Sequence, residues 1–209
     1  METLDPRTAA QLAFLVEADK LKSIVRANPL VDGSRRENSA EHSWHIALMA
    51  LVLAERSDEP VDLGRALGLC LVHDLVEIDA GDTPPWDEAG RATKAEREAA
   101  AADRLFALLP ADQAATFRGW WDEFEAAETP EAKLAHAVDS LAPLIVNHAE
   151  GGQLWRDKGR TEADVRARNA RLATWVPSLV PVVDALVDDA VAHGWFGEPE
   201  PDPEPDGEI

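Results

Sequence analysis

The sequence is poor in several residue types on which other classes of protein depend. Its 209 residues include one cysteine, no tyrosine, and 20 basic against 40 acidic residues, which gives a formal net charge of -20 at pH 7. A single cysteine, Cys70, excludes an internal disulfide framework and fits a reducing compartment. The acidic balance argues against binding to nucleic acid, whose phosphate backbone needs a basic surface. A small phosphate ligand is not excluded, because it responds mainly to the local charge of its site.

Long apolar runs are also lacking. No segment approaches the ~20 apolar residues that a helix needs to cross a bilayer, so we expect no membrane partner. The first residues, METLDPRTAAQLAF, lack the basic start and the apolar run of a signal peptide. Together with the single cysteine, this predicts a cytoplasmic protein.

The composition that remains is that of a folded protein. Hydrophobic residues make up 45% of the chain and charged residues 29%, which is ordinary for a globular domain. We predict one domain over residues 1–197 and a tail over residues 198–209. The tail reads EPEPDPEPDGEI, which offers no apolar face to bury and is interrupted by prolines, so we expect it to be disordered.

Hydrophobic spacing in the predicted domain favours helices throughout. No segment alternates with period two for long enough to predict a strand, so the expected fold class is all-α. The first predicted helix carries an apolar stripe that includes Leu12, Leu15, Val16, Leu21 and Val25. We expect helices over residues 6–26, from Asn38 or Ser39 onward, and over 62–78, 94–109, 111–127, 130–150, 161–175 and 177–193.

Ionisable residues stand in three of the most apolar predicted helices. His73 and Asp74 are followed one turn later by Glu77, and a buried carboxylate costs several kcal/mol unless a cation compensates it. A hydrogen-bonded His-Asp pair in the core is the simpler interpretation. His42 and Asp139, from two other predicted helices, favour a site instead. Two imidazoles and two carboxylates suit a divalent first-row metal ion.

The order of these residues resembles that of the HD-domain metal-dependent phosphohydrolase superfamily, and most of all its 5'-deoxynucleotidase branch. The resemblance extends over roughly residues 20–152. Its motifs here are Arg36-Glu37-Asn38, Glu41-His42, His73-Asp74-Leu75-Val76-Glu77 and Gly81-Asp82. The spacing from His73 to Asp82 is the most specific part of the match.

The resemblance implies an HD-type helical bundle that hydrolyses a small phosphate monoester, a (deoxy)nucleoside 5'-monophosphate in particular, and that forms a homodimer. It assigns the residues as follows: His42, His73, Asp74 and Asp139 as ligands of a divalent metal, Glu77 and Asp82 as catalytic residues, and Thr83 beside the substrate. Between Asp74 and Asp139 the only histidine is His136, so one metal ion per chain is expected rather than two. Manganese, cobalt, iron, nickel and zinc all remain open.

A phosphate group also needs cations, and in so acidic a chain these must be local. Arg35, Arg36 and Lys94 are candidates from the residues alone, and the resemblance favours Arg26. The branch ends its first helix with Arg-Trp-Pro, whereas this chain reads Arg26-Ala27-Asn28-Pro29. The arginine is one position early and the tryptophan is absent. The preference between ribose and deoxyribose therefore stays open, as does the alternative that Arg26 simply faces solvent.

Three other functions remain open at this point. The chain could hydrolyse another phosphate ester or a diester, which product analysis would distinguish. It could be a non-catalytic HD module that binds a nucleotide, although every catalytic position is filled. It could also be a purely structural bundle, which would bind no metal.

Overall fold

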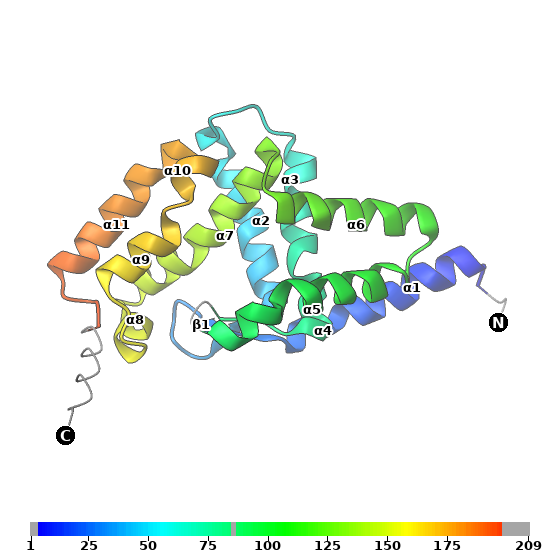
Figure 1. The fold of residues 1–209 in the computed structure, drawn as a ribbon, viewed down its shortest axis with the longest axis horizontal. Coiled ribbons are helices and arrows are strands. Elements are labelled where there is room, and N and C mark those ends of the chain that lie inside the picture. The colour runs from blue at the N-terminus through cyan, green and yellow to red at the C-terminus, as the bar shows by residue number, and fades with distance from the viewer. Residues whose placement is uncertain (1–3, 85–86, 198–209) are drawn as a thin grey trace, which may run out of the picture.

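The computed structural model of the chain describes residues 4–84 and 87–197, and helices dominate both ranges (Figure 1). The helices in chain order are α1 (Pro6–Ala18), α2 (Ser39–Leu53), α3 (Leu63–Val72), α4 (Glu77–Ala80), α5 (Glu88–Phe106), α6 (Ala111–Ala126), α7 (Pro130–Ala149), α8 (Gln153–Asp157), α9 (Glu162–Asn169), α10 (Leu172–Trp175) and α11 (Val180–Ala192). Short 3₁₀ helices lie at Asp19–Ser23, Ala54–Arg56, His73–Val76 and Pro177–Leu179. Strands β1 (Val25–Pro29) and β2 (Arg36–Asn38) pair as an antiparallel hairpin.

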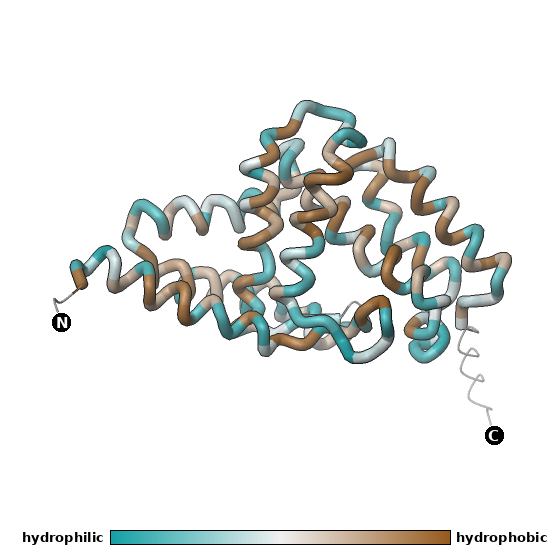
Figure 2. Tube along the Cα trace, turned by 180° about the vertical axis from the view of Figure 1, so that it is seen from behind, coloured by the Kyte–Doolittle hydropathy of each residue, from teal (hydrophilic) through white to brown (hydrophobic). Residues whose placement is uncertain are grey.

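Helices α2, α3 and α7 pack against one another and form the centre of the molecule. On one side of them lie α9, α10 and α11, and on the other lie α6, α5 and α1 (Figure 1). Ile46, Leu69 and Leu134 are fully buried where the three central helices meet, while Phe14 and Leu105 belong to a second apolar cluster under α1 and α5. Hydrophobic and hydrophilic residues follow one another at short intervals along the helices, as such one-sided packing requires (Figure 2).

The sequence predicts the starts of the central helices from their capping residues. Asn38 Oδ1 accepts a hydrogen bond from the Glu41 amide at 2.9 Å, and the Glu41 carboxylate accepts one from the Asn38 amide at 3.1 Å. This capping box satisfies two amides that the first turn of α2 would otherwise leave without partners. Thr129 caps α7 with a single bond, in which its hydroxyl oxygen accepts from the Ala132 amide at 3.2 Å, and Pro130 occupies the first position of α7, where no amide donor is needed.

The prediction for the first helix is wrong beyond Ala18. The chain passes through the 3₁₀ turn and becomes extended at Ile24, so that Val25 and Arg26 lie in β1 rather than in a helix. The hairpin also corrects the expectation that the chain contains no strand. The predicted apolar stripe is not a buried face, because Leu15 and Val16 are 61% and 72% exposed. Of the five named members of the stripe, only Leu21 is buried, and it enters the core together with Phe14, which the prediction did not include.

The structure differs from the predicted helices in four further respects. The helix expected over 62–78 is divided into α3, a 3₁₀ turn at His73–Val76, and α4. Helix α5 begins at Glu88, six residues early, because the Asp87 side chain caps it through the Gly90 amide. Helix α8 was not predicted. The helix expected over 161–175 is interrupted between α9 and α10.

Two further expectations concern the C-terminal tail and the relation of the chain to membranes. The predicted tail at 198–209 lies outside the described residues, so the domain boundary stays a prediction. Among the residues that the structure describes, no helix is both long and apolar enough to cross a membrane. The cytoplasmic location also stays a prediction.

Candidate active site

Three of the predicted metal ligands meet in a compact group at the centre of the bundle. His42 on α2, His73 on the 3₁₀ turn and Asp139 on α7 each offer one ligand atom, and these atoms lie within 4.8 Å of one another. His42 Nε2 is 2.9 Å from Asp139 Oδ1. Burial would raise the pKa of Asp139, but the contact with His42 outweighs it and holds that pKa well below its ordinary value.

The orientation of His73 fits a metal ion. Its Nδ1 lies 2.8 Å from the Cys70 carbonyl oxygen and must donate the proton there, since a carbonyl can only accept. This tautomer leaves a lone pair on Nε2. That nitrogen is buried and has no hydrogen-bond partner among the described residues. A backbone carbonyl that orients an imidazole in this way is a usual companion of metal-binding histidines.

Asp74 lies directly beside this group. Its Oδ1 is 3.0 Å from His73 Nε2, and its Oδ2 is 2.7 Å from Arg26 Nη1. Asp74 is buried, so its charge depends on the guanidinium of Arg26 for compensation. The structure thus brings all four residues that the sequence nominated as ligands to one place.

Glu77 is buried next to the same group. Ser39, from the first turn of α2, donates its hydroxyl to Glu77 Oε2 at 2.6 Å. Burial, and then the charge of Asp74, raise the pKa of Glu77 above its ordinary value. A carboxylate with a raised pKa beside a metal site is suited to accept and return a proton.

Arg26 occupies the centre of the acidic residues rather than facing solvent. Its guanidinium lies 2.7 Å from Asp74, 3.6 Å from Glu77 and 3.8 Å from Asp82, all through Nη1. Its Nε is 3.5 Å from Glu37 on β2. The β1–β2 hairpin therefore brings this arginine to the site, and the four carboxylates surround its charge.

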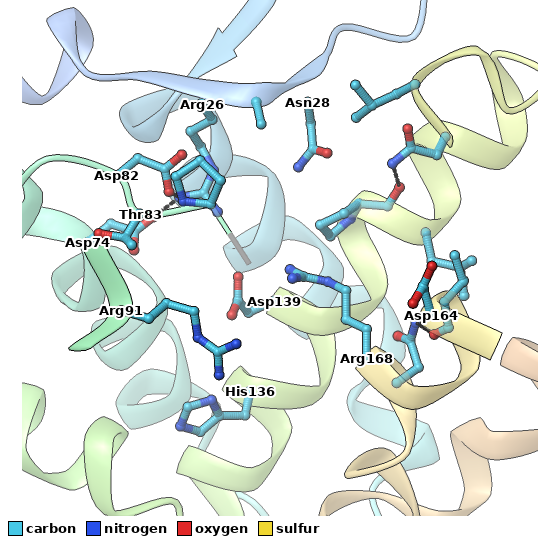
Figure 3. A pocket seen from close by; sticks show the side chains of 18 of the residues that line it. Arg26, Asn28, Asp74, Asp82, Thr83, Arg91, His136, Asp139, Asp164 and Arg168 are labelled. Atoms are coloured by element: carbon cyan, nitrogen blue, oxygen red, sulfur yellow. Dashed lines mark hydrogen bonds and ion pairs between the residues drawn. The ribbon is translucent and has the colours of Figure 1, made fainter. Parts of the chain in front are cut away.

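A cavity of about 690 Å³ opens beside the metal-ligand group (Figure 3). It is bounded by residues of β1, of the turn after α4, and of α5 to α9. Its lining residues include Arg26, Asn28, Asp82, Thr83, Arg91, Lys94, Asp139, Asn147, Trp155 and Arg168. A nucleotide-sized molecule fits within such a volume.

Two of the remaining predicted site residues, Asp82 and Thr83, reach this cavity because the chain turns at the glycine before them. Gly81 ends α4 with a φ of +73°, a conformation that side chains other than glycine rarely adopt, and the chain turns there. Asp82 and Thr83 follow and line the cavity. The Thr83 hydroxyl oxygen accepts a hydrogen bond from Arg97 Nη2 at 3.0 Å.

The predicted cations divide into those inside and those outside the cavity. Lys94 lines it, with Nζ 3.4 Å from Glu98 Oε1. Arg36 is exposed on β2 and does not line it. Arg35 is bound to Glu41, with Nη1 2.8 Å from Oε2. The structure therefore does not bring these two arginines to the cavity.

The lining residues that were missed from the sequence include Asn28, Arg91, Asn147 and Arg168. Arg91 reaches into the cavity from α5, and Arg168 reaches in from α9 (Figure 3). Asn147 lies two turns beyond Asp139 on α7, and this spacing is the one signal that could have identified it. Arg168 belongs to the segment EADVRARN, which has the composition of an ordinary solvated helix.

Comparison with known proteins gives a consistent set of similarities. The model of the HD domain family matches residues 18–179. The 5'-deoxynucleotidase HDDC2 of Bos taurus is 32% identical over 152 residues, which cover 72% of each chain. The 5'-deoxynucleotidase YfbR of Shigella flexneri is 27% identical over 196 residues, or 86% of this chain and 98% of that one.

A solved structure supports the same relationship. It is that of a predicted metal-dependent phosphohydrolase from Magnetospirillum magnetotacticum, with 51% sequence identity and a TM-score of 0.86. The superposition covers 91% of this chain and 96% of the other. The helical bundle is thus shared over nearly the whole length of both proteins.

Proposed function

The chain belongs to the HD-domain family, and from this premise we propose that it is a metal-dependent phosphohydrolase acting on a small phosphate monoester. The observation that carries the proposal is the buried His73 Nε2, which lacks a hydrogen-bond partner among the described residues and faces Asp74. A buried polar atom in that state is rare in proteins, and its lone pair suits a divalent cation. A nucleoside 5'-monophosphate is the proposed substrate, because relatives of the chain are named 5'-deoxynucleotidases.

His42, His73, Asp74 and Asp139 would hold the metal ion, one per chain. When bound, such an ion supplies positive charge to a phosphoryl oxygen and lowers the pKa of a bound water. The donor set of two imidazoles and two carboxylates admits manganese, cobalt, iron, nickel or zinc.

Glu77 is proposed as the base of the reaction, and Asp82 as a further catalytic residue with Thr83 beside the substrate. Water adds to phosphorus as Glu77 takes one of its protons. The bond from phosphorus to the ester oxygen then breaks, and the leaving oxygen takes a proton to give the free nucleoside and inorganic phosphate. General-base assistance of this kind contributes on the order of 10²–10⁴-fold.

The sugar preference of the proposed enzyme is a separate question. Asn28 lines the cavity directly before Pro29, the position that the tryptophan of the branch's Arg-Trp-Pro segment would occupy. An asparagine there leaves more room than a tryptophan beside the sugar. We therefore propose that ribonucleoside monophosphates are accepted along with the deoxy forms.

A phosphate-release assay tests the proposal. Metal-stripped protein, resupplied with manganese or cobalt, would be offered a panel of ribo- and deoxynucleoside 5'-monophosphates. We expect metal-dependent release that falls at least 100-fold in Glu77→Gln, in line with the loss of a general base. Glu17→Gln is the matched control, since Glu17 is half-buried in ion pairs with Lys20 and Arg104 and does not line the cavity. No release from any nucleotide by metal-loaded protein would contradict the proposal.

We also propose that the chain forms a homodimer through the outer face of α2. Trp44, Leu48, Leu51 and Val52 lie on one face of that helix and are 63%, 43%, 49% and 64% exposed. A contiguous exposed apolar face of this kind usually marks an interface. Sedimentation velocity should show a dimer that Leu51→Glu converts to a monomer. Val191→Glu, which alters an exposed valine on α11, should leave the dimer intact.

A further inference from the structure

We propose that Arg168 binds the phosphoryl group of the substrate at the metal site. This inference rests on the proposed function and adds to it a residue that the family motifs do not contain. It concerns how the site compensates the negative charge of the substrate. A phosphate monoester brings up to two negative charges into a cavity that already holds the carboxylates of Asp74, Asp82 and Asp139.

The arginine nearest the metal ligands is not available for this task. Arg26 lies within 4.0 Å of carboxylate oxygens of Asp74, Glu77, Asp82 and Glu37. Its side chain is only 11% exposed. Its charge therefore compensates the buried acids, and a phosphate would have to compete for it with four carboxylates that are already close.

Arg168 is in the opposite situation. Its side chain runs from α9 across the cavity, and its guanidinium faces Asp139 (Figure 3). Among the described residues it forms no hydrogen bond and no ion pair within 4 Å. The protein around the guanidinium lowers the pKa of Arg168, and the charge of Asp139 acts in the other direction. A guanidinium without hydrogen-bond partners beside a metal ligand is suited to donate two parallel hydrogen bonds to two oxygens of a phosphoryl group.

The packing of α9 fixes this position. Ser140 follows Asp139 on α7, Asn169 follows Arg168 on α9, and the Ser140 hydroxyl lies 3.2 Å from Asn169 Oδ1. Asn169 also donates its amide to the Val165 carbonyl at 2.9 Å. Ser140 and Asn169 are both buried. One buried hydrogen bond thus joins the neighbours of Arg168 and Asp139 and holds the two helices in register.

The proposal is tested with inorganic phosphate as the probe, so that the test does not depend on which nucleotide is hydrolysed. Titration calorimetry would measure phosphate binding to manganese-loaded full-length protein. We expect Arg168→Met to weaken phosphate binding by about 10- to 100-fold, which is the usual effect of losing a hydrogen bond to a charged group. Arg168→Lys should recover part of the affinity, since it restores the charge without the planar fork.

Arg171→Met is the matched control. Arg171 lies three residues further on, with its guanidinium 4.6 Å from the centre of the Trp175 ring, and it does not line the cavity. This variant should bind phosphate as the unaltered protein does. Manganese affinity should be unchanged in all three variants, which separates loss of phosphate binding from loss of the metal site or of the fold.

Steady-state kinetics add a second measurement. For a hydrolysed nucleotide, Arg168→Met should raise KM and the inhibition constant of phosphate together. Phosphate affinity in Arg168→Met equal to that of the unaltered protein would overturn the proposal, and so would an absence of phosphate binding to the unaltered protein. Phosphate binding that depends on Arg168, without hydrolysis of any nucleotide, would support the role of Arg168 and contradict the proposed function alone.

Discussion

At the scale of single residues, the bond from Ser39 to Glu77 has a measurable consequence. The hydroxyl donates to the charged carboxylate, which lowers the pKa of Glu77 and partly offsets the raising effects of burial and of Asp74. Ser39→Ala should raise this pKa. Because a protonated Glu77 cannot accept a proton, the acidic limb of kcat/KM should move to higher pH, by about one unit for a bond of ordinary strength.

Ser43 provides the comparison for this prediction. It lies one turn further along α2 and is also buried, but its hydroxyl has no hydrogen-bond partner among the described residues. Ser43→Ala should leave the pH profile where it is. An acidic limb that stays in place in Ser39→Ala as well would show that Glu77 is not the group that sets it.

Three of the site residues predicted from the sequence share one property, which is that their neighbours in the sequence are mainly apolar. His73, Asp74 and Asp139 stand among Leu, Val and Ala, so their charge is conspicuous there. Arg168 has no such signal, because α9 is charged along most of its length. Its role depends on the packing of α9 against α7, which is a tertiary contact between distant segments and leaves no local pattern.

At the scale of elements, the cap of α2 links stability to the site. Asn38→Ala removes the side chain that accepts from the Glu41 amide and should cost about 1 kcal/mol in the free energy of unfolding. Since α2 begins at this cap and carries His42 in its first turn, manganese affinity should fall as well. Denaturant titration and metal titration would measure the two effects.

Asp5→Ala tests whether the loss of affinity is local. Asp5 caps α1 through the Thr8 amide at 3.0 Å, far along the chain from any predicted ligand. It should lower stability by a similar amount and leave manganese affinity unchanged. Equal losses of affinity in both variants would mean that the cap of α2 acts only through global stability.

The elements that the sequence predicted well are those with strong local signals. Pro130 gives the start of α7 to the residue, and the choice of Asn38 or Ser39 as cap gives the start of α2 to within one residue. The hairpin was missed because β1 and β2 have five and three residues, too few for alternation to be visible. The 3₁₀ turn at His73–Val76 has the apolar composition of a helix, and only the packing around the site distinguishes its tighter winding.

At the scale of the whole molecule, the proposed metal site couples metal binding to unfolding. Its ligands extend from His42 to Asp139 and come together only in the folded chain, so a bound ion stabilises that state. With manganese at 100 times its dissociation constant, the gain is about 2.7 kcal/mol. For a chain of this length this corresponds to a rise in Tm of roughly 5–10 °C, measured by calorimetry.

His73→Ala should abolish that rise, because it removes one of the four proposed metal ligands. The comparison is needed in a chain with 40 acidic residues, where weak surface binding could also raise Tm. An equal rise in the variant would place the stabilising ions on the acidic surface rather than in the bundle.

The wall of the cavity also has an optical consequence. Because the chain has no tyrosine, its near-ultraviolet emission comes from its seven tryptophans alone. Trp155 lines the cavity, is 5% exposed, and stacks on Phe196 with ring centres 5.0 Å apart. A ligand that enters the cavity changes the surroundings of this indole, so the intensity or colour of the emission should report occupancy without any added label. Trp155→Phe should remove the change in emission, which would identify Trp155 as its source. The protein thus contains an intrinsic fluorescent probe of substrate entry.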